Sequence, residues 1–255
     1  MCIFFTMRIV HVYKPGCFGF ADYLRAIYSI SHLAAARGYE YRVAFNHPLG
    51  SLFDIDTAEY ETTVKCYKVL LEEIEKRTPL IVLESNHTEH YIPVTAGLIQ
   101  KYIKPLPVLT EAVDRKLSAL GLTKGRFMIL HARFGDNDAV CDDGFLRRIK
   151  GSLTIIRLQK LPILLLSSSR LITSAFAEAV AGVVVTGFTP QHTGTASASA
   201  SSASTASMLD TMIEFYMMAH AKKIYSISGG SFGTGKSGFS YWASKMFGLP
   251  FTHFD

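Results

Sequence analysis

The sequence predicts an α/β fold made of two Rossmann-like halves whose parallel sheets face a ligand-binding cleft. Short apolar runs with strand character alternate with helical repeats, which is the pattern of parallel sheets covered by helices. The alternation is interrupted between Pro105 and Lys124 and then restarts. The 255 residues are 49% hydrophobic and 18% charged, which is enough apolar material for two small domains. We expect an N-terminal domain over residues 1–120 and a C-terminal domain over residues 121–255.

The first half begins with a strand over residues 8–12 and a loop that contains two glycines. Residues 21–37 then place apolar side chains at helical spacing and stop at Gly38, as a C-capped helix does. The prolines between Pro93 and Pro107 predict an irregular segment. The other predicted elements are strands over residues 39–45 and 80–83 and helices over residues 61–77 and 111–120.

The second half repeats the strand–helix alternation four times. The predicted strands cover residues 126–131, 162–166, 183–185 and 223–228, and the predicted helices cover residues 145–159, 172–180, 208–222 and 240–247. Gln191 to Ser207 is nearly all Ser, Ala, Thr and Gly and has too little apolar surface to repay ordering, so we expect a mobile loop. Residues 250–254 are expected to be extended.

Charge and cysteine content exclude several classes of protein. The net charge of +5 suits an anionic ligand but lacks the dense Lys/Arg clusters of a nucleic-acid binder. The four cysteines stand far apart without metal-ligand spacing, so neither a disulfide framework nor a zinc site is expected. No run reaches the ~18 apolar residues of a membrane span, and the apolar start is too short for a signal peptide. We expect a protein of the cytoplasm or another soluble intracellular location.

The segment His131-Ala-Arg-Phe-Gly-Asp136 directly follows the apolar run Phe127–Leu130. Open parallel sheets bind ligands at the carboxyl ends of their strands, so this segment is a candidate binding site. The planar fork of Arg133 suits a phosphate, because it matches phosphate oxygens bidentately. The structural alternative is a hydrogen-bonded core histidine and an arginine paired with a nearby aspartate.

Two glycine-rich loops are further phosphate-binding candidates. Gly230 to Ser237 fits the P-loop pattern G-x-x-x-x-G-K-[ST] letter for letter, with a predicted strand before it and a helix after it. Only 18 residues follow Ser237, however, whereas a P-loop normally opens its domain and a later strand supplies a Mg²⁺-binding Asp. We therefore expect this loop to meet a phosphate in another fold or to be a plain connection. Gly16 and Gly19 let the first loop approach a ligand closely, or form a simple turn.

In combination, these segments resemble the fucosyltransferase superfamily of GT-B glycosyltransferases, which includes α1,2-, α1,6- and protein O-fucosyltransferases. The central H-x-R-x-G-D motif of that superfamily is filled by residues 131–136. The glycine loop opening a helix is similar to residues 17–25, with one extra residue between Gly19 and Asp22. The C-terminal motif, an acidic residue followed by a [ST]-x-F-S turn, is similar to Glu214 and Ser237-Gly-Phe-Ser240.

The chain departs from the family pattern in three ways. It is short for the family, so acceptor-binding elements are expected to be reduced. The acidic position is Glu214 where an Asp is usual, although Asp210 lies one helical turn earlier. An insertion, Gly229 to Lys236, separates the last strand from the turn and creates the P-loop-like string.

The resemblance implies a GT-B fold with a donor-binding cleft and an inverting, metal-independent transfer of a sugar, usually L-fucose, from a GDP-sugar to a hydroxyl of a glycan or protein. No cofactor or metal is implied. Arg133 would hold the β-phosphate and His131 would lie beside the diphosphate. The other residues implied in donor binding are Gly16, Gly19, Asp22, Glu214 or Asp210, Ser237, Phe239 and Ser240. Asp22, Asp136 and Glu84 are the candidates for a general base.

Two alternatives stay open at this point. A P-loop kinase or NTPase would use residues 230–237 and Mg²⁺-ATP. A non-catalytic GDP-sugar-binding protein would keep the fold and lose the transfer, which the short chain and the imperfect first glycine loop would explain.

Overall fold

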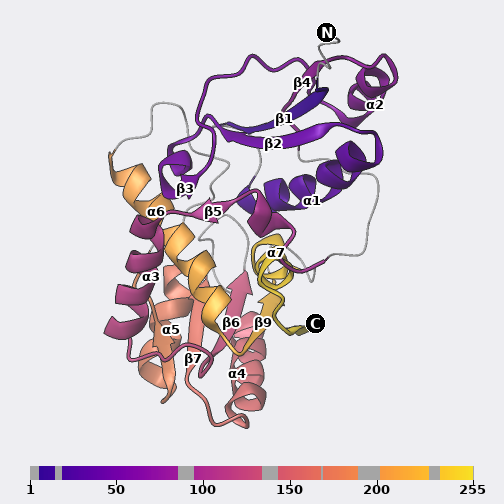
Figure 1. Ribbon diagram of the computed structural model, residues 1–255. Helices are drawn as coiled ribbons and strands as arrows, with labels where there is room; N and C mark the ends of the chain where they lie inside the picture. Colours follow the sequence, from indigo (N-terminus) through magenta and orange to yellow (C-terminus); the bar gives the residue numbers. More distant parts are fainter. Residues whose placement is uncertain are drawn as a thin grey trace. The chain divides into compact units, whose positions relative to one another are not determined.

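The computed structural model describes residues 6–14, 19–85, 95–133, 143–167, 169–188, 202–229 and 236–254. These residues fall into two compact units, with the division between Leu106 and Pro107. Each unit combines helices with a parallel sheet, as the sequence predicts (Figure 1). No helix in the described part of the chain is long and apolar enough to cross a membrane.

The first unit is built on a three-stranded parallel sheet with β1 in the middle, in the order β2-β1-β4. Arg8 at the start of β1 lies opposite Glu40 of β2 and Leu80 of β4. A two-stranded antiparallel ribbon joins β3 to β5. The elements are β1 Arg8–Tyr13, α1 Phe20–Ala36, β2 Glu40–Phe45, η1 Pro48–Leu52, β3 Phe53–Asp54, α2 Tyr67–Glu75, β4 Leu80–Leu83, η2 Ile99–Lys101 and β5 Lys104–Pro105.

Both faces of this small sheet are covered. On one face, the rings of Tyr13, Tyr23 and Phe45 lie within 5.4 Å of one another, and Tyr23 brings α1 onto the strands. On the other face, a cluster that includes Val10 and Val82 is covered by Tyr60. Because aromatic side chains bury large areas, a few of them suffice to close a core of this size.

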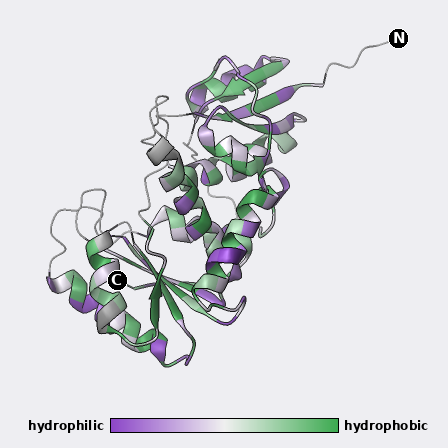
Figure 2. Ribbon diagram, turned by 90° about the vertical axis from the view of Figure 1, so that its left-hand side faces the viewer, coloured by the Kyte–Doolittle hydropathy of each residue, from purple (hydrophilic) through white to green (hydrophobic). Residues whose placement is uncertain are grey.

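The second unit is built on a five-stranded, all-parallel sheet in the order β10-β9-β6-β7-β8. Its strands are apolar along most of their length (Figure 2), as expected for a parallel sheet covered on both faces. The elements are α3 Pro107–Ala119, β6 Met128–Arg133, α4 Asp143–Arg157, β7 Ile163–Ser167, α5 Arg170–Ala179, β8 Val183–Val185, α6 Ser202–Met217, η4 Met218–His220, β9 Lys223–Ser228, α7 Gly238–Phe247 and β10 Phe251–Phe254.

The two faces of this sheet have different chemistry. Leu130, Leu165 and Ile227 point toward α4 and α5 and form a purely apolar core with them. The opposite face carries His131 of β6, which contacts Phe239 and Ser240 of α7. The polar groups of the sheet are therefore concentrated on the side of α7, toward the carboxyl ends of the strands.

The structure corrects two sequence-based expectations. The helix expected over residues 61–77 begins only at Tyr67, because the preceding segment lies along β4, where the amides of Thr63 and Val64 donate to the carbonyl of Val82. The Ser/Ala-rich stretch is helical from Ser202 onward, so the mobile-loop prediction was wrong there; alanine is the strongest helix former. Residues 189–201 lie outside the described part.

The segment around residues 107–119 also differs from its predicted place. The irregular region ends at Pro107, which opens α3 at a helical position where proline is favoured. Helix α3 packs against α6 and so belongs to the second unit, whereas the predicted boundary after residue 120 places it in the first half. The C-terminal residues, expected to be extended, form β10 in parallel pairing with β9.

Candidate functional site

The chain reverses its direction of sheet growth between β6 and β9 in the second unit. It runs outward from β6 to β7 and β8 and then returns to place β9 on the other side of β6. Ligands of open α/β sheets bind at such reversals, beyond the carboxyl ends of the strands. His131 lies opposite Ser226 here, and Arg133 lies opposite Ser228. Since side chains alternate along a strand, these four residues share one face of the sheet.

His131 is buried and is held by α7. Its Nδ1 atom lies 3.1 Å from the hydroxyl of Ser240, and its ring lies 5.6 Å from the ring of Phe239. Burial lowers the pKa of His131 to about 3, and the positive charge of Arg133 contributes to the same shift. The imidazole is therefore neutral at physiological pH and acts as a hydrogen-bonding group rather than as a cation.

Arg133 and the start of α7 bring positive charge to the same strand end. Arg133 is the last residue of β6. Its carbonyl accepts a hydrogen bond of 2.9 Å from the amide of Gly229, which extends the pairing of β6 and β9 by one residue. Ser237 precedes α7 and is buried, whereas Lys236 is exposed. The amino terminus of a helix favours anions through its unsatisfied N–H groups and its dipole. This strand end can therefore hold a phosphate group.

Three residues that the sequence reasoning missed also lie at this edge. The hydroxyls of Ser226 and Ser228 are buried and have no hydrogen-bond partner among the described residues. Arg148 of α4 donates a 3.0 Å hydrogen bond to the carbonyl of Ser228. Buried polar groups without partners are costly, so they commonly serve a ligand or an ordered water. Alternating serines at the end of an apolar strand were the available sequence signal.

The carboxyl side chains of Glu214 and Asp210 form a second polar cluster beyond β8, which we call the carboxylate pole. The phosphate-binding candidates at the end of β6 form the first pole. The hydroxyl of Thr186, just after β8, donates a short hydrogen bond to Glu214 of α6. Burial raises the pKa of Glu214 to about 8; the Thr186 bond opposes this shift and the charge of Asp210 adds to it. Burial also raises the pKa of Asp210, against the charge of Lys116. The Lys116 ammonium lies 4.1 Å from the ring centroid of Phe188.

The two poles belong to one edge of one sheet. Thr186 follows β8, which stands two strands away from β6, and neighbouring strands lie about 4.8 Å apart. The phosphate-binding candidates and Glu214 are thus separated by on the order of 10 Å along the sheet. An elongated ligand with an anionic end and a hydrogen-bonding base can contact both poles.

The remaining sequence-derived residues are distributed as follows. Gly19 precedes α1 in the first unit, with a backbone conformation open to any residue, and Asp22 forms a 3.4 Å ion pair with Arg25. Glu84 follows β4 in the same unit. Gly16 and Asp136 lie outside the described residues, as do residues 230–235 of the P-loop-like string.

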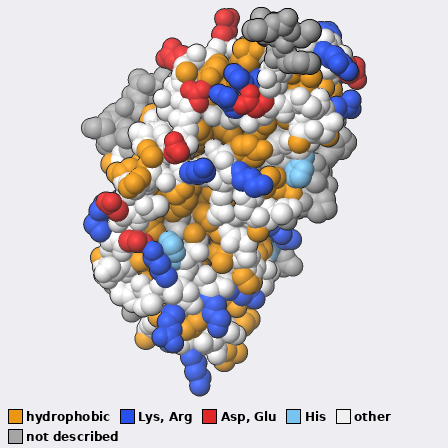
Figure 3. Space-filling view, in the orientation of Figure 1, with side chains coloured by type: hydrophobic (Ala, Val, Ile, Leu, Met, Phe, Trp, Pro, Cys, Tyr) orange, Lys and Arg blue, Asp and Glu red, His pale blue; other side chains and the backbone are white. Residues whose placement is uncertain are grey.

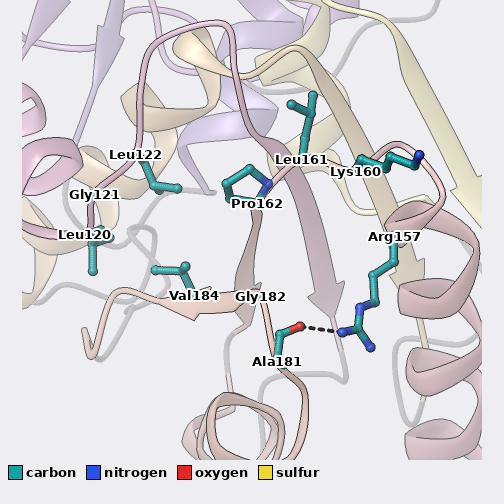
Figure 4. Close-up of a pocket in the computed structure, with 10 residues that line it drawn as sticks. All are labelled: Leu120, Gly121, Leu122, Arg157, Lys160, Leu161, Pro162, Ala181, Gly182 and Val184. Atoms are coloured by element: carbon teal, nitrogen blue, oxygen red, sulfur yellow. Dashed lines mark hydrogen bonds between the residues drawn. The ribbon is translucent and has the colours of Figure 1, made fainter.

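A hollow of about 410 Å³ lies at the opposite, amino-terminal edge of the second sheet (Figure 4). Arg157 and Lys160 are the charged residues in the described part of its lining, and Arg157 donates a 2.8 Å hydrogen bond to the carbonyl of Ala181. Its other lining residues are leucines, glycines, Ala181, Pro162 and Val184. The described residues that line this hollow include no carboxylate, hydroxyl or imidazole, whereas the carboxyl edge has all three, so we take the carboxyl edge as the candidate site.

Metal binding has no obvious ligand set in the described ranges. Those residues contain no group of three or more His, Cys, Asp or Glu side chains that could hold a metal ion.

No protein-family model and no curated protein matches the sequence, but solved structures match the fold. The fucosyltransferase NodZ from Bradyrhizobium superposes with a TM-score of 0.59, at 12% identity, over 98% of this chain and 96% of NodZ. FUT1 from Arabidopsis thaliana gives a TM-score of 0.62 at 10% identity, over 97% and 70% of the two chains. POFUT1 gives 0.56 at 13% identity, over 98% of both chains. This chain has the fucosyltransferase fold.

The fucosyltransferase fold accounts for nearly the whole chain rather than for one sheet. The predicted GT-B class with two parallel α/β halves is therefore confirmed. At 10–13% sequence identity these matches show the fold alone. Any inference about chemistry therefore depends on the residues described above.

Proposed function

We propose that this protein is a fucosyltransferase that moves L-fucose from GDP-fucose to a hydroxyl of a glycan or protein acceptor, with inversion and without a metal. The observation that carries the proposal is the contact between His131 and Ser240, which sets the end of β6 against the start of α7. In the same fold, NodZ was co-crystallised with GDP and soaked with GDP-fucose, and FUT1 and POFUT1 were solved with GDP.

The diphosphate of the donor would bind at the end of β6. As the bond between sugar and phosphate oxygen breaks, negative charge develops on the β-phosphate. Arg133 would stabilise this charge with a fixed cation, and Ser237, Phe239 and Ser240 would present the amino end of α7 to the phosphates. One preorganised donor of this kind accounts for about 10²–10³ in rate in other enzymes.

The guanine would bind at the carboxylate pole. A carboxylate can accept hydrogen bonds from both N1–H and N2–H of guanine, and adenine offers no such pair of donors. Glu214 is buried and oriented by Thr186, with Asp210 one turn earlier on the same helix. Burial keeps Glu214 protonated in the free protein at neutral pH, and hydrogen bonds from the guanine N–H groups would favour its ionised form, so guanine binding would release that proton. The pole would thereby select GDP-sugars over ADP-sugars.

The transfer itself would pass through an oxocarbenium-like state, with the acceptor hydroxyl attacking from the face opposite the leaving diphosphate. His131, neutral and bonded to Ser240, would position the diphosphate without adding charge. Asp22, Asp136 and Glu84 are the carboxylates proposed to assist the attacking hydroxyl.

The test is a donor comparison with mass-spectrometric detection of the product. We expect transfer, or donor hydrolysis, from GDP-fucose in preference to GDP-mannose and UDP-galactose, and no loss of rate in EDTA. Arg133→Ala should reduce the rate by about 10²–10³ while the protein stays folded. Arg157→Ala, on the amino-terminal edge of the same sheet, is the matched control. Equal use of all three donors, or a fully active Arg133→Ala, would contradict the proposal.

A further inference from the structure

The first unit carries a polar cluster at the carboxyl end of its own sheet. Lys14 Nζ donates a 2.5 Å hydrogen bond to the hydroxyl of Thr62, which donates a 3.0 Å bond to Oε2 of Glu84. Lys14 Nζ and Glu84 Oε2 are 3.7 Å apart, and about a quarter of each of these two side chains is exposed. The cluster thus combines an ammonium, a hydroxyl and a carboxylate that solvent can reach.

The topology places this cluster at a binding position. The chain leaves β1 to form β2 on one side and later adds β4 on the other side, so sheet growth reverses between β1 and β4. Lys14 directly follows β1, and Glu84 directly follows β4. The rule that locates ligands at the reversal of an open α/β sheet selects the β6–β9 edge in the second unit and this cluster in the first.

The surrounding bonds fix the backbone of the cluster. Nε2 of His11 donates a 2.7 Å hydrogen bond to the carbonyl of Ser85, and the hydroxyl of Tyr41 bonds Nδ1 of His11 at 2.8 Å. The amide of Glu84 donates to the carbonyl of Val64. These bonds hold the backbone of Glu84 and Ser85, so the carboxylate of Glu84 is presented from a fixed position at the end of β4.

The chemistry of the cluster suits a neutral polyol. Its formal charge is zero, which disfavours an isolated anion or cation. The carboxylate accepts hydrogen bonds from sugar hydroxyls, whereas the ammonium and the threonine hydroxyl can donate to sugar oxygens. Ion pairs that solvent can reach add little to stability, so the fold loses little when these groups hydrogen-bond to a ligand.

We propose that Lys14, Thr62 and Glu84 form the binding site for the acceptor sugar, and that the acceptor is a neutral saccharide. This inference rests on the proposed transferase function, because that function requires a bound acceptor hydroxyl. Glu84 would accept the hydrogen bond of an acceptor hydroxyl, with Lys14 and Thr62 fixing a neighbouring oxygen.

The experiment is a ¹H–¹⁵N NMR titration of the full 28.2 kDa chain with glucose, galactose, N-acetylglucosamine, lactose and cellobiose. We expect at least one of them to shift the amides of Lys14, Thr62 and Glu84, and Glu84→Gln to weaken that binding about tenfold. Thr62→Val, nearly the same size, should weaken it too, and its thermal midpoint shows whether the fold is kept. Glu75→Gln, an exposed residue at the end of α2, is the control.

The outcomes separate this inference from the proposed function. If no saccharide shifts these amides, or if Glu84→Gln and Thr62→Val bind as tightly as the wild type, the acceptor site is refuted. A parallel titration with GDP reports on the second unit. Saccharide binding without GDP binding would overturn the transferase assignment and leave a saccharide site. GDP binding without saccharide binding would refute the acceptor site and leave the transferase assignment standing.

Discussion

Replacing Glu214 with glutamine tests the electrostatics of the carboxylate pole, where we propose that guanine binds. The change keeps the shape of the side chain and its ability to accept the hydrogen bond from Thr186, but it removes the titrating group. The pKa of Glu214 rises from 4.5 to about 8 because the carboxylate is buried. Between these two values the folded protein keeps a proton that the unfolded chain has lost, so the wild type loses stability as the pH rises.

The size of the effect follows from the shift. Each pKa unit corresponds to 1.36 kcal/mol, so a shift of about 3.5 units sets a ceiling on the order of 5 kcal/mol across the window. The slope approaches ~1.4 kcal/mol per pH unit. Asp210 and Lys116 are present in both proteins, so their effects on stability largely cancel when variant and wild type are compared. Glu214→Gln should therefore gain stability over the wild type by several kcal/mol between about pH 5 and about pH 8.

The assay is urea unfolding at a series of pH values, followed by the fluorescence of Trp242. This is the only tryptophan of the chain, and it is buried in α7, so it reports on the second unit. The quantity to plot is the free energy of unfolding of Glu214→Gln minus that of the wild type. A difference that stays constant with pH would show that Glu214 is ionised in the folded protein and would refute the reasoning.

Three further predictions use the same physical arguments. His11→Leu should lower the free energy of unfolding by about 1–3 kcal/mol at neutral pH, because the buried carbonyl of Ser85 loses its donor. Burial lowers the pKa of His11 to about 4, so below about pH 6.5 the unfolded imidazole takes up a proton first and the wild type loses stability. The variant should lose less stability than the wild type over this pH range. Gly229→Ala should destabilise the second unit by ~1–3 kcal/mol, because its Cβ would lie 2.4 Å from the buried ring of Phe145, and a double-mutant cycle with Phe145→Ala should recover part of that loss. The wild type and Lys236→Ala should hydrolyse Mg²⁺-ATP at the same background rate in a phosphate-release assay; a rate that depends on this lysine would revive the P-loop interpretation.

The periodicity of the sequence was enough to predict the alternating elements and the two parallel sheets. β6 and its polar end were predictable because an apolar run changes abruptly into His131 and Arg133. Helix starts were less predictable. The segment before Tyr67 looks helical by apolar spacing, but pairing with β4 prevails over that preference. The helix from Ser202 was missed because composition was weighed above the helix propensity of alanine.

The partners of the site residues could not be predicted, because they depend on strand order. Ser226 and Ser228 matter only because β9 lies beside β6, and no spacing along the chain carries that information. The bond between Thr186 and Glu214 joins residues on a strand end and a helix that are separated by a long connection. The cluster of Lys14, Thr62 and Glu84 similarly exists only once β4 lies beside β1.

Figure 3 shows lysine and arginine side chains spread over the displayed face, with acidic side chains among them in its upper and middle parts, so the distribution of charge does not by itself mark the proposed donor site. The claim that this site binds a guanine nucleotide through Arg133 is tested most directly by calorimetric titration of GDP, UDP and ADP. We expect GDP to bind most tightly, and Arg133→Ala to weaken it about 10- to 100-fold, as for the loss of a charged hydrogen bond worth ~1.5–3 kcal/mol. Arg157→Ala should bind GDP as the wild type does. Equal affinities for the three nucleotides, or unchanged GDP binding by Arg133→Ala, would contradict the account.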